Sequence, residues 1–192
     1  MPLPFGHSLM GYALYESAHQ ETKAISWRMI LLFVLVANLP DIDFFPGFLI
    51  GHPNKFHHNL THSLGFSLLI GGFLGAIFCH KKGKRFLPYF FLFTGLCFSH
   101  VVLDFFTADT SQPYGVPILW PLSSTYFMSP LSIFMSVQKS GTGHTFIQSL
   151  FVMHNLWVAL WEIILFIPIL SIIKVVKRRC RLGPTLADEK SF

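Results

Sequence analysis

The sequence predicts an all-α, polytopic membrane protein: a bundle of four to five helices with a proline-rich loop over its outer end. Of its 192 residues, 52% are hydrophobic and only 12% are charged, whereas about 25% are charged in ordinary soluble domains. The basic residues gather in short runs beside apolar stretches, as cytoplasmic membrane anchors do. We therefore expect the lipid bilayer as the partner and no nucleic acid.

The first two predicted helices are the least regular. Residues 5–20 look helical but carry His7, Glu16 and His19, so this helix either crosses the membrane shielded by neighbours or lies in the interface. Residues 24–39 form a short apolar segment near the lower length limit of a membrane span. The dipeptide Pro46-Gly47 then indicates a loop.

Three clear spans follow, at residues 60–79, 86–106 and 153–173. In the first of them, Gly71 and Gly75 form a small-xxx-small pair suited to close helix packing. Prolines at 113, 117, 121 and 130 indicate that residues 107–148 are a structured loop over the bundle end. We predict one membrane-embedded domain over residues 1–180 and a short polar cytoplasmic tail over 181–192.

The orientation follows from two basic runs, Lys81–Arg85 and Lys174–Arg181, which should be cytoplasmic. This predicts a multi-pass protein of the cytoplasmic (inner) membrane. The end of segment 24–39, the start of span 60–79 and the end of span 86–106 then all lie at the non-cytoplasmic face. Each of these three ends carries a polar cluster, so we expect the clusters to meet there.

The clusters are rich in histidine, the commonest metal ligand in proteins. They comprise Asp41 and Asp43, then His57, His58 and His62, then His100 and Asp104, with His7 as a further contributor. His100 and Asp104 are four positions apart and share a helix face. We expect His57 in a loop and His62 in the first turn of the next helix, with Asn59 or Thr61 as its N-cap.

Each cluster also has a purely structural explanation. His100 and Asp104 are also typical of a hydrogen-bonded helix end, and aspartates such as Asp43 often terminate helices. The histidines can be interfacial groups without a metal. Ionisable groups within a span are costly and usually functional, which favours ligation, whereas Glu162 is expected to be hydrogen-bonded inside the bundle.

Nitrogen and oxygen ligands without cysteine suit Zn²⁺, with Mn²⁺ or Fe as alternatives. The candidates exceed the three protein ligands of a typical catalytic zinc, which leaves room for one or two ions. A metal-activated water attacks phosphorus or carbonyl centres. Asp43 then orients a metal ligand or acts as general base, and His58 is a ligand, a group that orients a ligand, or a substrate contact.

The order of these motifs resembles the YdjM-like membrane-bound metal-dependent hydrolases over about the first 125 residues. The matching residues are His7, Leu39–Asp43, His57–Ser63, His100–Asp104, Gly115 and Leu119–Ser123. The resemblance implies a metal hydrolase with His7, Asp41, His57, His62, His100 and Asp104 around the metal. Members usually have an arginine and a glycine where this chain has His58 and Asn59, so the likeness does not extend to a basic anchor there.

The predicted function is metal-dependent hydrolysis of a lipid or lipid-linked (phospho)ester at the outer face of the membrane, with Asp43 and His58 as candidate catalytic residues. The alternative is a non-enzymatic membrane transporter of metal or protons, since intramembrane histidines and aspartates also mark ion pathways. A third possibility is a structural protein with a metal staple. The sequence does not predict an oligomeric state.

Overall fold

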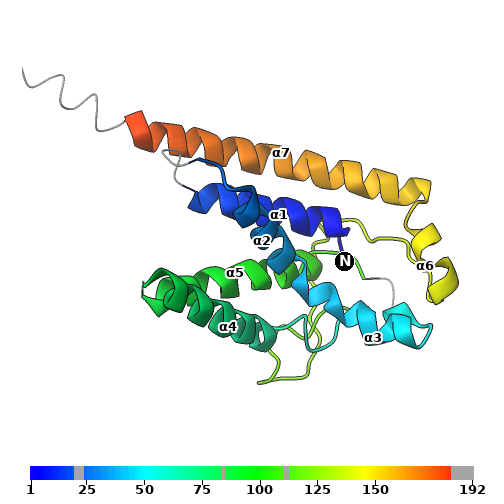
Figure 1. Ribbon diagram of the computed structural model, residues 1–192. Helices are drawn as coiled ribbons and strands as arrows, with labels where there is room; N and C mark the ends of the chain where they lie inside the picture. Colours follow the sequence, from blue (N-terminus) through cyan, green and yellow to red (C-terminus); the bar gives the residue numbers. More distant parts are fainter. Residues whose placement is uncertain (20–23, 84, 110–112, 183–192) are drawn as a thin grey trace, which may run out of the picture.

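The computed structural model describes residues 1–19, 24–83, 85–109 and 113–182 (Figure 1). Over these residues the chain forms seven α-helices and two short 3-10 helices, and it contains no strand. Three helices are long and apolar enough to cross a membrane, namely α4 (Leu64–Lys82), α5 (Phe86–Phe105) and α7 (Met153–Leu182). The predicted all-α membrane bundle is confirmed. The predicted tail lies outside the described residues from 183 onward, and residues 181–182 still belong to α7.

The second membrane segment is broken. Helix α2 (Trp27–Ala37) has 11 residues, about 16 Å at 1.5 Å per residue, which is roughly half of a hydrocarbon core. The chain then turns through the 3-10 helix η1 (Leu39–Asp43) into α3 (Phe44–Leu49), bent by 56° from α2, and the pair together is apolar enough to be a fourth span. The loop predicted at Pro46-Gly47 was wrong: Pro46 lies in the first turn of α3, where its missing N–H is tolerated.

Helix α1 (Pro4–Ala18) lies between α2 and α7 (Figure 1). At Gly11 an added Cβ would lie 2.9 Å from the carbonyl oxygen of Phe33 on α2, so the two backbones are in contact. At the end of α1 the Glu16 carboxylate pairs with Lys177 of α7 at 3.4 Å. These contacts hold His7, near the start of α1, against the middle of the bundle.

Helices α4 and α5 form a tight antiparallel hairpin. A Cβ at Gly71 would clash with Thr94 Oγ1, and one at Gly75 would lie 3.0 Å from the Phe90 nitrogen. The small-xxx-small pair is therefore the contact surface between the two helices, because only glycine permits this approach.

The segment 113–142 runs past the ends of α4 and α5 that face away from this hairpin turn, and helix α6 (Gly143–Ser149) packs on α3 through Phe146 (Figure 1). The first N–H groups of α4, at Leu64 and Gly65, donate to the carbonyls of Ile118 and Trp120 at 2.8 and 2.9 Å. At the end of α5 the Phe106 carbonyl accepts from Ile133 N–H at 2.8 Å. Helix ends leave such groups unpaired, so the predicted capping loop is fixed by the two helix ends that carry the site.

The N-cap of α4 differs from the expectation. Ser63, and neither Asn59 nor Thr61, accepts the Phe66 N–H at 3.1 Å. His62 therefore lies in the loop before α4, outside the first turn of that helix.

The glycine contact gives a direct test of the α4–α5 packing. Gly71→Ala should lower stability by about 1–3 kcal/mol, because overpacking forces the two helices apart. A Cβ at the adjacent Gly72 would meet nothing within 4 Å, so Gly72→Ala is the matched control and should leave stability unchanged or slightly raised. Thermal unfolding in detergent measures both, and equal midpoints for the two variants would refute this packing.

Candidate metal centre

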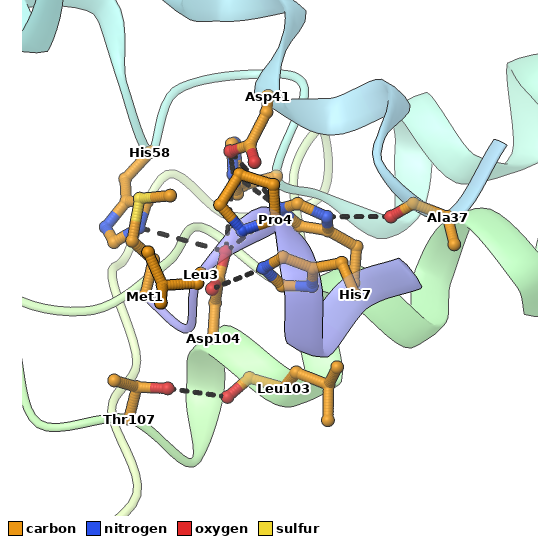
Figure 2. A network of polar contacts seen from close by, with 12 residues as sticks. Met1, Leu3, Pro4, His7, Ala37, Asp41, His58, Leu103, Asp104 and Thr107 are labelled. Atoms are coloured by element: carbon orange, nitrogen blue, oxygen red, sulfur yellow. Dashed lines mark hydrogen bonds and ion pairs between the residues drawn. The ribbon is translucent and has the colours of Figure 1, made fainter. Parts of the chain in front are cut away.

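The eight residues singled out in the sequence lie together at one end of the bundle, delivered by four segments. They are His7 of α1, Asp41 and Asp43 of η1, His57, His58 and His62 between η2 (Pro53–Phe56) and α4, and His100 and Asp104 of α5. Most are buried, and the Asp41 side chain, 14% exposed, is the most accessible. Figure 2 shows the side chains of His7 and His58 pointing toward Asp104.

Three donor atoms form a nearly regular triangle. His62 Nε2 lies 3.2 Å from His100 Nε2, and Asp104 Oδ2 lies 3.3 Å from each of them. Ligands on a tetrahedral ion with bonds of 2.0–2.1 Å are separated by roughly 3.3 Å. The triangle therefore has the dimensions of three corners of a tetrahedral site. Asp41 Oδ1 lies 3.6 Å from His62 Nε2 and 3.5 Å from His100 Nε2, beside two of these corners.

The outward nitrogens of both histidines have partners that fix their orientation. His100 Nδ1 lies 2.8 Å from the Ala37 carbonyl oxygen, and His62 Nδ1 lies 3.0 Å from a carboxylate oxygen of Asp43. Both partners only accept hydrogen bonds, so each Nδ1 is the donor and each Nε2 presents its lone pair to the triangle. This is how metal-ligating histidines are held in proteins.

The Ala37 carbonyl is available because α2 ends there. In a continued α-helix this carbonyl would accept the N–H of Asp41. That N–H instead donates to the Asn38 carbonyl at 3.2 Å, in the tighter 3-10 turn. Pro40, which has no N–H, favours this break. The break thus frees an acceptor for His100 and turns Asp41 toward the cluster.

A second group of donors adjoins the triangle. The ligand atoms of Asp41, Asp43, His57 and His62 all lie within 4.8 Å of one another. The Asp43 carboxylate is fully engaged, because Oδ1 lies 3.1 Å from His57 Nδ1 and Oδ2 accepts from Thr61 Oγ1 at 2.9 Å as well as from His62. Asp43 therefore orients two histidines at once, and His57 Nε2 is left without a hydrogen bond.

The remaining two histidines approach Asp104 from the sides. His7 Nε2 lies 3.6 Å from Asp104 Oδ1, and its ring stacks on that of His100 with centroids 3.6 Å apart. His58, at a left-handed φ of 60°, places Nε2 3.8 Å from Asp104 Oδ2, while its Nδ1 lies 3.1 Å from Asp109 Oδ2. A left-handed backbone is uncommon for a residue other than glycine and often accompanies function.

The cluster contains many buried polar atoms that make no hydrogen bond with the described residues. They are both nitrogens of His7, both oxygens of Asp41 and of Asp104, and the Nε2 atoms of His57 and His58. A buried carboxylate without a compensating partner is strongly unfavourable. A divalent cation supplies that compensation, and a nitrogen and oxygen donor set without sulfur suits Zn²⁺, Mn²⁺ or Fe. The residues present therefore fit a metal ion.

Sequence reasoning did not assign two residues that the structure brings to the cluster, Asp109 and Lys139. Asp109 pairs with His58, and its Oδ2 also accepts the Gly115 N–H at 3.2 Å. The ammonium of Lys139 interacts electrostatically with Asp41 and Asp104. One feature of the sequence could have indicated them: they are the only two charged residues between positions 107 and 148.

The fold and the cluster together define a multi-helix membrane protein with a buried histidine–carboxylate centre able to hold metal at one end of its bundle. The family model described as YdjM inner membrane protein matches residues 1–180, and the chain belongs to this family. The match includes α7, beyond the first 125 residues on which the resemblance rested. No curated protein and no solved structure matches the chain.

The protonation of His62 makes metal binding depend on pH. Burial lowers the pKa of His62, but the negative charges of Asp104, Asp41 and Asp43 close to its ring outweigh burial and raise it well above its ordinary value. In the metal-free protein His62 therefore keeps its proton at neutral pH, and a metal must displace it.

We expect the metal affinity to rise with pH from 6 to 8, with close to one proton released from His62 for each ion bound at the triangle. Calorimetric titration of the chelator-stripped protein in buffers of different ionisation enthalpy measures this release. Weakening the Asp43 contact in Asp43→Asn should lower the metal affinity roughly 10- to 100-fold, the usual effect of losing an orienting partner. Affinity independent of pH would contradict the assignment.

Proposed function

We propose that this protein is a metal-dependent hydrolase of the inner membrane that cleaves a lipid or lipid-linked (phospho)ester. The observation that carries the proposal is the triangle of His62, His100 and Asp104, whose dimensions fit three protein ligands of one ion. Catalytic zinc sites have three protein ligands and a fourth position for water or substrate. Asp41, His57 and His7 would supply further ligands to this ion or hold a second one.

A bound divalent ion would supply Lewis-acid polarisation of a substrate oxygen and acidification of a water molecule. The net reaction consumes one water and breaks one ester bond, giving an alcohol and an acid. The residues of the chain position these events. Asp43 keeps His57 and His62 oriented, and Ala37 keeps His100 oriented.

His58 is the residue best placed to carry a proton. Its Nδ1–H is fixed by Asp109, and its unpartnered Nε2 faces Asp104 across 3.8 Å. Burial lowers its pKa, against the opposing effect of Asp109, so the ring is neutral at pH 7 and its Nε2 can accept a proton. We assign His58 as general base and Asp43 as the group that orients the ligands.

The surroundings of Asp41, the most exposed ligand candidate, support a lipidic substrate. Ile42 follows Asp41 in η1, and Phe45 and Leu49 lie on the adjoining helix α3; all three expose apolar side chains. Such a patch beside a polar centre is typical of membrane contact or of a site for apolar ligands. The acyl part of a lipid would lie on these side chains while its ester reaches the cluster.

The distribution of buried charge favours a hydrolase over a transporter. A transport path needs polar groups through the full membrane depth. Among the described residues, the buried aspartates, glutamates and histidines are Glu162 and members of the site, and no lysine or arginine is buried. Glu162 lies near the site level, because its Oε1 accepts the Leu3 N–H at 2.7 Å. Between it and Lys177, about 22 Å further along α7, no buried acid, histidine, lysine or arginine continues the path in the described residues.

The site lies at the end of the bundle opposite the basic residues of the α4–α5 turn and of the end of α7. The positive-inside rule assigns those basic residues to the cytoplasm. A cysteine replacing Leu122, 88% exposed in the capping loop, should therefore react with an impermeant thiol reagent added to intact cells. Lys82→Cys, at the α4–α5 turn, should react only after lysis. The experiment uses a background without native cysteines, and the reverse pattern would place the site on the cytoplasmic side.

Asp104 should be essential and Glu162 dispensable for hydrolysis. Asp104→Asn keeps the shape but removes a ligand charge, so metal-dependent hydrolysis should fall by about two orders of magnitude or more. Glu162→Gln keeps an acceptor for Leu3 and should retain most activity. Hydrolysis is measured in detergent, and metal flux in proteoliposomes, for both variants. Flux that requires Glu162, without hydrolysis by the wild type, would refute the enzyme in favour of the transporter.

A further inference from the structure

Lys139 lies in a stretch of the capping segment whose backbone is held on both sides. The Gln138 N–H donates to Asn155 Oδ1 at 2.8 Å, and Asn155 Nδ2 returns a bond to the Gln138 carbonyl at 2.7 Å. On the other side the Ser140 N–H donates to Ser149 Oγ at 2.7 Å, and its carbonyl accepts from Asn54 at 3.1 Å. These four hydrogen bonds from side chains to Gln138 and Ser140 fix the backbone position of Lys139 and the direction in which its side chain extends.

The side chain reaches the edge of the metal centre. Its Nζ lies 4.9 Å from the ring centroid of Phe44, and that ring stacks on His57 with centroids 4.0 Å apart. The ammonium also donates to the Met1 thioether sulfur at 3.0 Å. Figure 2 shows Met1 on the same side of the cluster as His58. Lys139 is thus one ring away from a predicted metal ligand.

The contacts of the Lys139 ammonium are weak ones for the charge of a partly buried side chain. A thioether is a weak acceptor, and an aromatic face gives a modest cation–π attraction. Among the described residues, no carboxylate lies within the 4.0 Å of an ion pair with Lys139. Structural lysines in such places normally pair with an acid. This ammonium therefore retains donors for an anion that the described residues do not supply.

The ammonium is nevertheless coupled to the centre. Burial lowers the pKa of Lys139 to about 8, and Asp41, Asp104, Asp109 and Asp43 act in the opposite direction. The lysine therefore remains largely protonated at neutral pH. An anionic oxygen bound against Nζ would stabilise the protonated form in the same way.

We propose that Lys139 binds the negatively charged phosphate group of the substrate next to the metal centre. This inference rests on the proposed function and narrows it to phosphate-bearing esters. The phosphate can belong to a lipid headgroup or to a soluble phosphoester, and both would place an anionic oxygen against Nζ. Lys139 is then a substrate-binding residue contributed by the loop that also caps α4 and α5.

The test uses the full-length protein in detergent, loaded with Zn²⁺, and titrates inorganic phosphate by calorimetry. Lys139→Met should raise the dissociation constant for phosphate roughly 10- to 100-fold, as expected for loss of a charged hydrogen bond. Lys139→Arg retains the charge and should stay within a few-fold of the wild type. Lys55→Met is the matched control, because Lys55 also lies over a phenylalanine ring at this end of the protein but is exposed, and its phosphate binding should equal that of the wild type.

Metal content is measured for every variant and should be unchanged, which separates phosphate binding from loss of the site. Equal phosphate affinity in Lys139→Met and the wild type would overturn the proposal. So would an equal loss in Lys55→Met, or metal-loaded wild-type protein that binds no phosphate. A wild type that hydrolyses only neutral carboxylic esters, independently of Lys139, would also overturn it while leaving the hydrolase intact.

Two substrates then distinguish the sources of the phosphate. A phospholipid in mixed micelles and glycerol 3-phosphate in solution are compared in the wild type and in Lys139→Met. A KM raised at least tenfold for the phospholipid alone supports a lipid headgroup, and the same rise for both supports a soluble phosphoester. Lys139-dependent phosphate binding without any hydrolysis would preserve this proposal and refute the proposed function.

Discussion

The buried carboxylate of Asp104 is the constraint on which the rest of the structure depends. It lies on a membrane-spanning helix with both oxygens free of hydrogen bonds from the described residues, and a charge in such surroundings requires a nearby cation. His7, His58, His62 and His100 surround it within 4 Å. Because His62 and His100 use their Nδ1 hydrogens elsewhere, their Nε2 atoms do not donate to the carboxylate without an added proton. A metal resolves this conflict, since it satisfies the carboxylate and both lone pairs together.

The broken helix α2–η1–α3 shows how a membrane segment can accommodate polar residues and an unpaired carbonyl. Irregular backbone at membrane depth is tolerated where it is covered by protein. Here the break is covered by α5 and by the loop before α4, and its unpaired Ala37 carbonyl is used by His100. One interruption of the helix thus supplies an orienting acceptor, a ligand candidate in Asp41 and a double orienting group in Asp43. An unbroken α2 would have used the carbonyl internally and placed both aspartates differently.

Much of this arrangement was predictable, and the reasons differ from one element to another. The three spans follow from continuous apolar runs, and the convergence of His62 and His100 follows from helix length and orientation, since both spans end at the same membrane face. The helix α3 was not predicted, because a proline next to a glycine usually signals a turn and the exception depends on where the helix begins. The N-cap at Ser63 depends equally on tertiary contacts: Thr61, whose residue type also favours N-caps, bonds to Asp43 instead.

The loop over the site could be predicted as a cap but its chemistry could not, because nothing local fixes where an irregular segment directs its side chains. Asp109 and Lys139 are thirty positions apart, and neither belongs to a periodic pattern. Their direction is set by long-range bonds, from Gly115 to Asp109 and from Asn155, Ser149 and Asn54 to the neighbours of Lys139. Charged residues are nonetheless expensive in so apolar a segment. Because this loop carries only one acid and one base, each is best explained by a partner at the site that the loop covers. For Asp109 that partner is His58, and for Lys139 we propose a substrate anion.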